Sequence, residues 1–180
     1  MEKFYNKSAK FYDDEYDPKF NHSHFERYAS KRWDILNNII KQDNPNFEMN
    51  KILDLGCGEG NFTNYINNQS KSNVIGVDAS DRCCEIAKER YGNISILNED
   101  CENLSFNDNT FDLVFTNAVL HHVEDIGKAV LEAYRVAKTD GYIVFIEPNR
   151  YHPLQILHGI ASKHERGTLS FSMSQIRALL

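Results

Sequence analysis

An apolar run that ends abruptly in three glycines constrains this chain more than any other feature. Residues 51–61 read KILDLGCGEGN, so Gly56, Gly58 and Gly60 follow the apolar residues at alternate positions. Glycine adopts positive φ and lets a ligand approach the backbone closely, and the N–H groups that open the next helix point toward such a ligand. The stretch therefore predicts a buried strand, a tight turn and a helix start that together cradle a nucleotide-like ligand.

Two residues beside the turn indicate which ligand it holds. A dinucleotide-binding turn has glycine or alanine three residues after its second glycine, and this chain has Asn61 there. Asp54 lies two residues before the first glycine, where a carboxylate suits an ammonium group, or a water bound near one, better than a pyrophosphate. The pattern favours a ligand with a nucleoside at one end and an amino acid at the other.

The turn, with the letters DLGCGEG at residues 54–60, resembles the first motif of the class I S-adenosylmethionine-dependent methyltransferases. The resemblance implies S-adenosylmethionine as the cofactor and S-adenosylhomocysteine as the product. It also implies that Glu59 and the backbone of residues 56–60 hold the amino-acid end of the donor. The cofactor-binding residues implied over the whole chain are Tyr12, Asp54, Gly56, Cys57, Gly58, Glu59, Gly60, Asp78, Ala79, Asp100, Cys101 and Asn117.

Residues 1–45 are rich in aromatic and charged side chains at helical spacing. In the second of two expected helices, at 23–41, we expect Trp33 and Leu36 to pack on the main domain. In the methyltransferases that the chain resembles, an N-terminal helical segment folds over the cofactor as a lid and excludes water. We therefore predict a helical lid segment at 1–45 and an S-adenosylmethionine-binding methyltransferase domain at 46–180.

Two later acidic residues follow predicted strands, as the glycine turn does. A strand at 74–77 ends in Asp78, 24 residues after Asp54, where α/β nucleotide sites place the acid that binds the ribose hydroxyls. The alternative is that Asp78 only caps the next helix. A third strand is followed by Asp100, placed to accept from an adenine amino group beside the backbone N–H of Cys101, unless Asp100 is simply a solvated loop acid. Asp54, Asp78 and Asp100 are thus all expected at or near the carboxyl ends of strands, where ligands bind in such folds.

A fourth strand at 111–115 leads into residues 116–123. In the methyltransferases that the chain resembles, this segment passes beneath the methyl donor. The resemblance implies that Asn117 lies at the methionine end of the donor and that His121 or His122 lies on the acceptor side. Histidine acts as a general base near neutral pH, so both are candidate catalytic residues; the alternative is that they only pack or cap a helix.

The last elements of the pattern are a helix at 126–138, a turn at 139–141 and a strand at 142–146, so strands and helices alternate along the chain. It predicts an α/β fold with a doubly wound, mostly parallel sheet that binds ligands at the carboxyl ends of its strands. The resemblance implies a Rossmann-like methyltransferase fold that lacks its last two strands in this chain. We expect the natural protein to continue past Leu180, or the sheet edge to be covered by the lid or by a partner chain, as in a homodimer.

Composition sets limits on partners and compartment. With 180 residues, 41% of them hydrophobic, the chain can bury one core. No apolar run approaches the roughly 18 residues that cross a bilayer, and the N-terminus lacks a signal peptide's apolar region, so we expect no membrane span and a cytoplasmic location. A net charge of −6 argues against a nucleic-acid partner. The four cysteines fit neither a metal-ligand spacing nor a disulfide framework, so we expect reduced thiols and no metal.

The resulting prediction is a methyltransferase that resembles the small-molecule group related to quinone-biosynthesis enzymes (methyltransferase type 11). It would transfer a methyl group from S-adenosylmethionine to a small-molecule acceptor by in-line displacement, with positioning as the main source of rate. The segment after Glu147 is expected to shape a pocket for an apolar or anionic acceptor, or else to form a solvated helix. Two other classes remain open: a non-catalytic module that binds a nucleoside or stabilises a partner enzyme, and a nicotinamide-dependent oxidoreductase, against which Asn61 argues.

Overall fold

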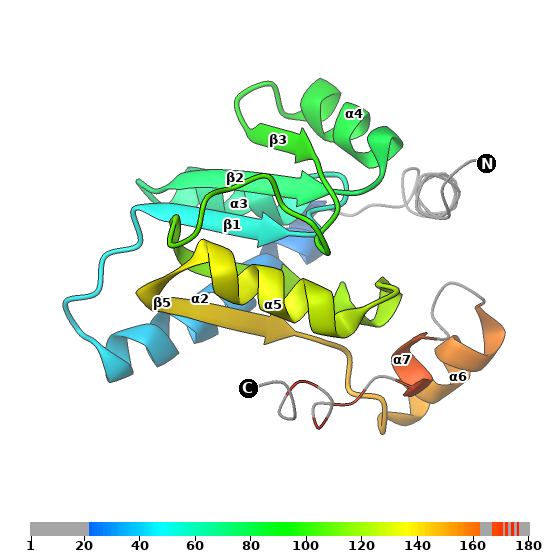
Figure 1. Cartoon of the computed structure of the whole chain (residues 1–180). Helices are drawn as coiled ribbons and strands as arrows, with labels where there is room; N and C mark the ends of the chain where they lie inside the picture. Colours follow the sequence, from blue (N-terminus) through cyan, green and yellow to red (C-terminus); the bar gives the residue numbers. More distant parts are fainter. Residues whose placement is uncertain (1–21, 163–166, 171, 173, 175, 177–180) are drawn as a thin grey trace.

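The computed structural model describes residues 22–162, 167–170, 172, 174 and 176 (Figure 1). These residues form a five-stranded parallel sheet with the strand order β3-β2-β1-β4-β5. The strands are β1 (Lys51–Leu55), β2 (Asn73–Asp78), β3 (Ser95–Asn98), β4 (Phe111–Asn117) and β5 (Ala137–Ile146). Strand β1 pairs with β2 on one side and with β4 on the other, so the strand order reverses beside it. Open α/β sheets bind their ligands at such a reversal, outside the carboxyl ends of the strands.

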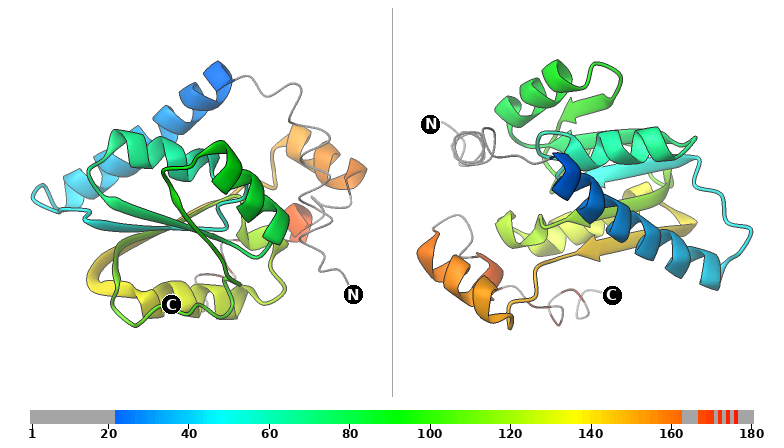
Figure 2. Two further views of the ribbon diagram at one scale, coloured as in Figure 1. Left: turned by 90° about the horizontal axis from the view of Figure 1, so that it is seen from above. Right: turned by 180° about the vertical axis from the view of Figure 1, so that it is seen from behind.

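Helices cover both faces of the sheet, as Figure 2 shows. Helices α2 and α3 pack on one face and α5 packs on the other. This arrangement confirms the predicted doubly wound α/β fold. The described helices are α2 (His22–Asp43), α3 (Asn61–Gln69), α4 (Asp81–Arg90), the short 3-10 helix η2 (Leu120–His122), α5 (Ile126–Val136), α6 (Pro153–Ala161) and α7 (Gly167–Ser170).

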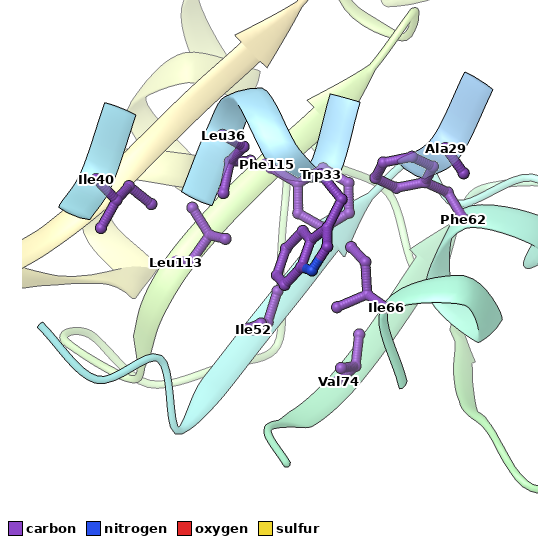
Figure 3. Close-up of a cluster of buried hydrophobic side chains, with 10 residues drawn as sticks. All are labelled: Ala29, Trp33, Leu36, Ile40, Ile52, Phe62, Ile66, Val74, Leu113 and Phe115. Atoms are coloured by element: carbon purple, nitrogen blue, oxygen red, sulfur yellow. The ribbon is translucent and has the colours of Figure 1, made fainter. Parts of the chain in front are cut away.

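The core under α2 fixes this helix on the sheet (Figure 3). Trp33 and Leu36 of α2 are buried against Phe62 of α3 and Phe115 of β4, which confirms the expected packing. Burial of each such large side chain stabilises the fold by about 1.5–3 kcal/mol. Because α2 is anchored in this way, its neighbouring side chains are held in fixed positions over the sheet.

The boundary between α5 and β5 differs from the prediction. The helix ends at Val136 rather than at residue 138, and the strand begins at once with Ala137 rather than at residue 142. Ala137 pairs with Phe111, but the next pair along β4 joins Leu113 to Tyr142, so the intervening residues form a bulge. The turn-like residues 139–141 therefore interrupt the strand without ending it, because a bulge accommodates extra residues within a ladder.

The first predicted helix and Tyr12 lie outside the described residues, so the lid over residues 1–45 stays a prediction. Of the helices that the structure does describe, none combines the length and apolar character needed to cross a bilayer.

Candidate functional site

The three glycines of the turn after β1 all have positive φ, of 79°, 55° and 73° in chain order. A Cβ on Gly56 would lie 2.5 Å from both methyl groups of Val119, and one on Gly60 would lie 3.0 Å from the Cβ of Ala87. A Cβ on Gly58 would meet nothing within 4 Å. Two of the glycines thus permit close internal packing, whereas Gly58 leaves open space at the surface of the turn, where a ligand can approach the backbone.

Hydrogen bonds fasten the turn to the end of β2. The N–H groups of Gly56 and Cys57 both donate to the carbonyl of Val77, at 2.8 and 2.9 Å. The N–H of Gly58 donates to Asp78 Oδ2 at 2.8 Å. These three N–H groups therefore hold the turn beside β2 instead of facing a ligand, and they bring the glycine turn and the acid of β2 into one site.

Asp54 lies on β1 beneath the turn and is 1% exposed. Its Oδ2 accepts a hydrogen bond of 2.6 Å from the hydroxyl of Thr63 on α3. Burial, with a smaller contribution from the nearby charge of Asp78, raises the pKa of the Asp54 carboxyl to about 7, although the hydrogen bond from Thr63 acts in the opposite direction. A cationic group bound in this site would favour the ionised carboxylate, so the electrostatics fit an ammonium or sulfonium ligand.

Asp78 ends β2 and stands beside the open face of Gly58. Besides the bond from the turn, its Oδ1 accepts from the N–H of Ser80 at 2.9 Å, and burial raises its pKa. The cap of α4 is Ser80, whose hydroxyl accepts from the N–H of Cys83, so Asp78 is not needed for capping. An ionised carboxylate offers about four acceptor positions. Asp78 therefore retains capacity for two hydroxyls of a diol, with Ala79 next to it.

The predicted adenine and amino-acid contacts already have partners within the chain. Asp100 is exposed, and its Oδ1 accepts from the N–H of Glu102 at 2.9 Å, so it stabilises its own loop. Cys101 packs between two apolar clusters, and burial raises the pKa of its thiol to about 12. Glu59 forms an ion pair with Arg90 of α4. Their contacts to a cofactor stay predictions.

The end of β4 is held from two sides. Asn117 Oδ1 accepts a hydrogen bond of 3.3 Å from the hydroxyl of Tyr28 on α2. The next residue, Ala118, has a φ of 62°, and its N–H donates to the carbonyl of Ile146 at 2.7 Å. A left-handed alanine costs about 1–2 kcal/mol, and such strain gathers at functional sites. The structure thus places Asn117 firmly at the carboxyl edge of the sheet, next to the reversal of strand order.

A buried acid after β5 holds the histidine segment. Glu147 Oε1 accepts from the N–H groups of Val119 and Leu120, at 2.9 and 2.8 Å, and Oε2 lies 2.6 Å from His121 Nδ1. The ring of His122 lies beside that of His121, tilted by 44° with ring centroids 3.9 Å apart. Sequence reasoning missed this Glu147–His121 pair, although an acid at the end of a fifth parallel strand repeats the pattern of the other three. These contacts fix the segment after β4, and a catalytic role of His121 or His122 stays a prediction.

A cavity of about 550 Å³ opens at the carboxyl ends of β4 and β5. Its wall is formed by Tyr28 and Arg32 of α2, by Asn117 and Ala118, and by parts of the segment 146–155. The structure therefore arranges the predicted residues in two neighbouring places. An acidic cradle lies at β1 and β2, and this cavity lies at β4 and β5, with Asn117 on its wall.

Comparison with known proteins gives a consistent result. Residues 53–145 match a family described as a methyltransferase domain. The chain is 32% identical over 139 residues to a demethylmenaquinone methyltransferase of Bacteroides fragilis, which covers 72% of this chain and 56% of the relative. A second such enzyme, from Staphylococcus epidermidis, is 32% identical over 143 residues, with 67% of this chain and 57% of the relative covered. The chain thus spans a little over half the length of the curated relatives that it matches.

A solved structure extends the similarity to the fold. The structure of a putative S-adenosyl-L-methionine-dependent methyltransferase from Methanococcus maripaludis matches with a TM-score of 0.61 and 25% identity. The match covers 81% of this chain and 65% of the other.

Proposed function

The chain belongs to the S-adenosylmethionine-dependent methyltransferases, in the family of methyltransferase domains that matches its residues 53–145, and we propose that it transfers a methyl group from S-adenosylmethionine to a small-molecule acceptor. The observation that carries the proposal is the open cradle at Gly58, which has positive φ, free space where a Cβ would stand, and Asp78 at hydrogen-bonding distance from its N–H. A nucleoside with a vicinal diol fits this cradle.

The residues of the cradle match the chemistry of this donor. Asp78 would accept hydrogen bonds from the ribose hydroxyls, and the buried Asp54 would favour the positive charge of the amino-acid end. Asn117, held by Tyr28, would orient that end toward the cavity. Bound S-adenosylmethionine supplies a methyl group already activated on a sulfonium, so the reaction is an in-line displacement. The task of the chain is to align the two ligands and to exclude water.

The names of the curated relatives make demethylated quinols the first acceptor class to test. A net charge of −6 and four thiols without disulfides support a small-molecule acceptor and a cytoplasmic location rather than a nucleic-acid substrate or an oxidising compartment. A lid at residues 1–45 and a homodimer would further shield the site.

Calorimetric titration of S-adenosylmethionine and S-adenosylhomocysteine into the purified chain tests the cofactor assignment. We expect binding by the wild type and by the control Asp140→Ala, which changes an exposed acid on β5. Asp78→Ala should bind at least about tenfold more weakly, because charge-assisted hydrogen bonds are lost. Equal affinities of Asp78→Ala and the wild type, or no binding by the wild type, would contradict the proposal. Donor binding without methyl transfer to any quinol or cell extract would instead identify a nucleoside-binding module.

A further inference from the structure

The cavity between α2 and the ends of β4 and β5 has a cation in its wall. Arg32 projects from α2, and its guanidinium carbon lies 3.4 Å from the centroid of the Tyr28 ring. The hydroxyl of the same tyrosine donates to Asn117, so the three side chains form one continuous wall. The aromatic ring therefore holds the guanidinium in place through a cation–π contact.

The charge of Arg32 lacks a partner of opposite sign within the described part of the chain. Its Nε is buried, and no atom of the described residues forms a hydrogen bond with it. Burial lowers the pKa of this guanidinium, which is the direction expected when a cation is desolvated without an adjacent carboxylate. A guanidinium carries five N–H donors in a planar fork that matches carboxylate and other anionic oxygen groups.

The acid that shares the cavity does not neutralise this charge. Glu147 already accepts two backbone N–H bonds through one oxygen and contacts His121 through the other. The other polar side chains of the lining are amides, such as those of Asn149 and Gln155, together with the Tyr28 hydroxyl and the imidazole of His152, and none of them is a carboxylate. The cavity thus combines about 550 Å³ of space with a guanidinium that is available to a ligand.

We propose that Arg32 binds an anionic oxygen of the methyl acceptor, such as a carboxylate or a phenolate, in the cavity at the carboxyl ends of β4 and β5. This inference rests on the proposed methyl-transfer function and adds the chemical class of the acceptor. An adjacent guanidinium also lowers the pKa of an acceptor hydroxyl and so favours its deprotonated, nucleophilic form. That effect reduces the need for a side-chain base.

The donor's own carboxylate is the rival source of such an anion. The arrangement of the residues favours the acceptor, because Arg32 lines the cavity at β4 and β5, whereas the turn and Asp78 form the cradle at β1 and β2. Asn117 lies on the wall of the cavity, on the strand next to β1. An acceptor bound at Arg32 would therefore lie beside the amino-acid end of the donor.

Fluorine NMR titration with 4-fluorobenzoate and its neutral counterpart 4-fluorobenzamide tests the site without turnover. We expect the wild type to bind the benzoate more tightly than the amide, and Arg32→Gln to lose at least about tenfold in benzoate affinity with the amide unaffected. Lys31→Gln removes the same charge from an exposed neighbour on α2 and should change neither affinity. Arg32→Lys keeps the charge without the fork and should give an intermediate affinity.

Three results of that titration would overturn the proposal. They are absence of benzoate binding by the wild type, equal benzoate affinity of Arg32→Gln and the wild type, and an equal loss in Lys31→Gln. Thermal denaturation of each variant verifies that it is folded, and Arg32→Lys provides a second variant in which the site is altered but the charge is retained.

Calorimetry with S-adenosylhomocysteine and with 5′-methylthioadenosine, which lacks the amino-acid carboxylate, separates the two sources of the anion. Unchanged binding of both nucleosides by Arg32→Gln supports the acceptor. Selective loss of S-adenosylhomocysteine would assign Arg32 to the donor and overturn the proposal. Failure of the wild type to bind either nucleoside would refute the proposed function, whereas the benzoate result tests Arg32 by itself.

Discussion

Replacement of Asp54 by asparagine tests the electrostatics of the cradle most directly. The carboxyl is buried on β1 and accepts a hydrogen bond of 2.6 Å from the hydroxyl of Thr63. Asparagine has nearly the same shape, and its amide oxygen can accept the same bond. The substitution therefore removes the negative charge while the packing stays almost unchanged.

The expected effect follows from the pKa of this carboxyl. Burial raises this pKa from 3.8 to about 7. Each unit of the rise corresponds to about 1.4 kcal/mol, so ionisation of the buried carboxyl lowers the free energy of unfolding by up to about 4 kcal/mol. The folded state binds the proton more tightly than the unfolded state, so this cost is absent below about pH 4, grows as the pH rises to about 7, and is constant above. We expect Asp54→Asn to be about 2–4 kcal/mol more stable than the wild type at pH 8 and nearly equal at pH 4.

Urea denaturation at a series of pH values between 4 and 8, followed by the fluorescence of the single tryptophan, measures this difference. Trp33 is buried in the core, so unfolding changes its surroundings. Asp140→Asn, which changes an exposed acid, is the matched control and should follow the wild type at every pH. A stability difference between Asp54→Asn and the wild type that does not depend on pH would refute the reasoning. The gain in stability should be accompanied by weaker binding of S-adenosylhomocysteine, because the ligand's ammonium loses its counter-charge.

Four further substitutions test the geometry of the site. Gly58→Ala should cost only about 1–2 kcal/mol of stability, from its positive φ, yet weaken S-adenosylhomocysteine binding at least about tenfold in calorimetry. Gly56→Ala should cost about 1–3 kcal/mol more in urea denaturation, since its Cβ would overlap Val119; equal losses at the two glycines would contradict this assignment. Ala118→Gly should raise stability by about 1 kcal/mol by relieving a left-handed alanine, and a loss in the same assay would argue against the strain. Glu147→Ala should cost about 3 kcal/mol or more because two backbone N–H groups and a buried histidine lose their acceptor, and a cost below about 1 kcal/mol would exclude this structural role.

The fold was largely predictable because its signals are local and repeated. Apolar runs that end at Leu55, at Asp78 and shortly before Asp100 mark strands, and parallel strands must bring their carboxyl ends to one edge. The glycine turn could be placed at this edge from the sequence alone. The start of β5 could not, because residues 139–141 carry turn chemistry and only the pairing of β4 with Tyr142 turns them into a bulge.

The details of the site were less predictable because they depend on tertiary contacts. His121 and Glu147 are 26 residues apart, and no local pattern pairs them. The role of Gly56 likewise depends on Val119, which follows β4 in the sequence but packs against the turn after β1. In the sequence, Arg32 is one of several basic residues on an expected helix. Only the packing of α2 on the sheet shows that Arg32 lines the cavity. Sequence spacing therefore predicted the cradle at β1 and β2 that we propose for the donor, but not the cavity that we propose for the acceptor.

The two halves of the site carry opposite charge, and this has a consequence for catalysis. Asp54 and Asp78 make the cradle at β1 and β2 acidic, whereas Arg32 makes the wall of the cavity at β4 and β5 basic. A cationic donor and an anionic acceptor would each be drawn to its own side of the point where the strand order reverses. The cationic sulfonium of the donor and the deprotonated acceptor would then attract each other electrostatically. Such a site would need no histidine base, although the Glu147 contact at His121 Nδ1 leaves Nε2 for that role, and the catalytic roles of His121 and His122 stay predictions.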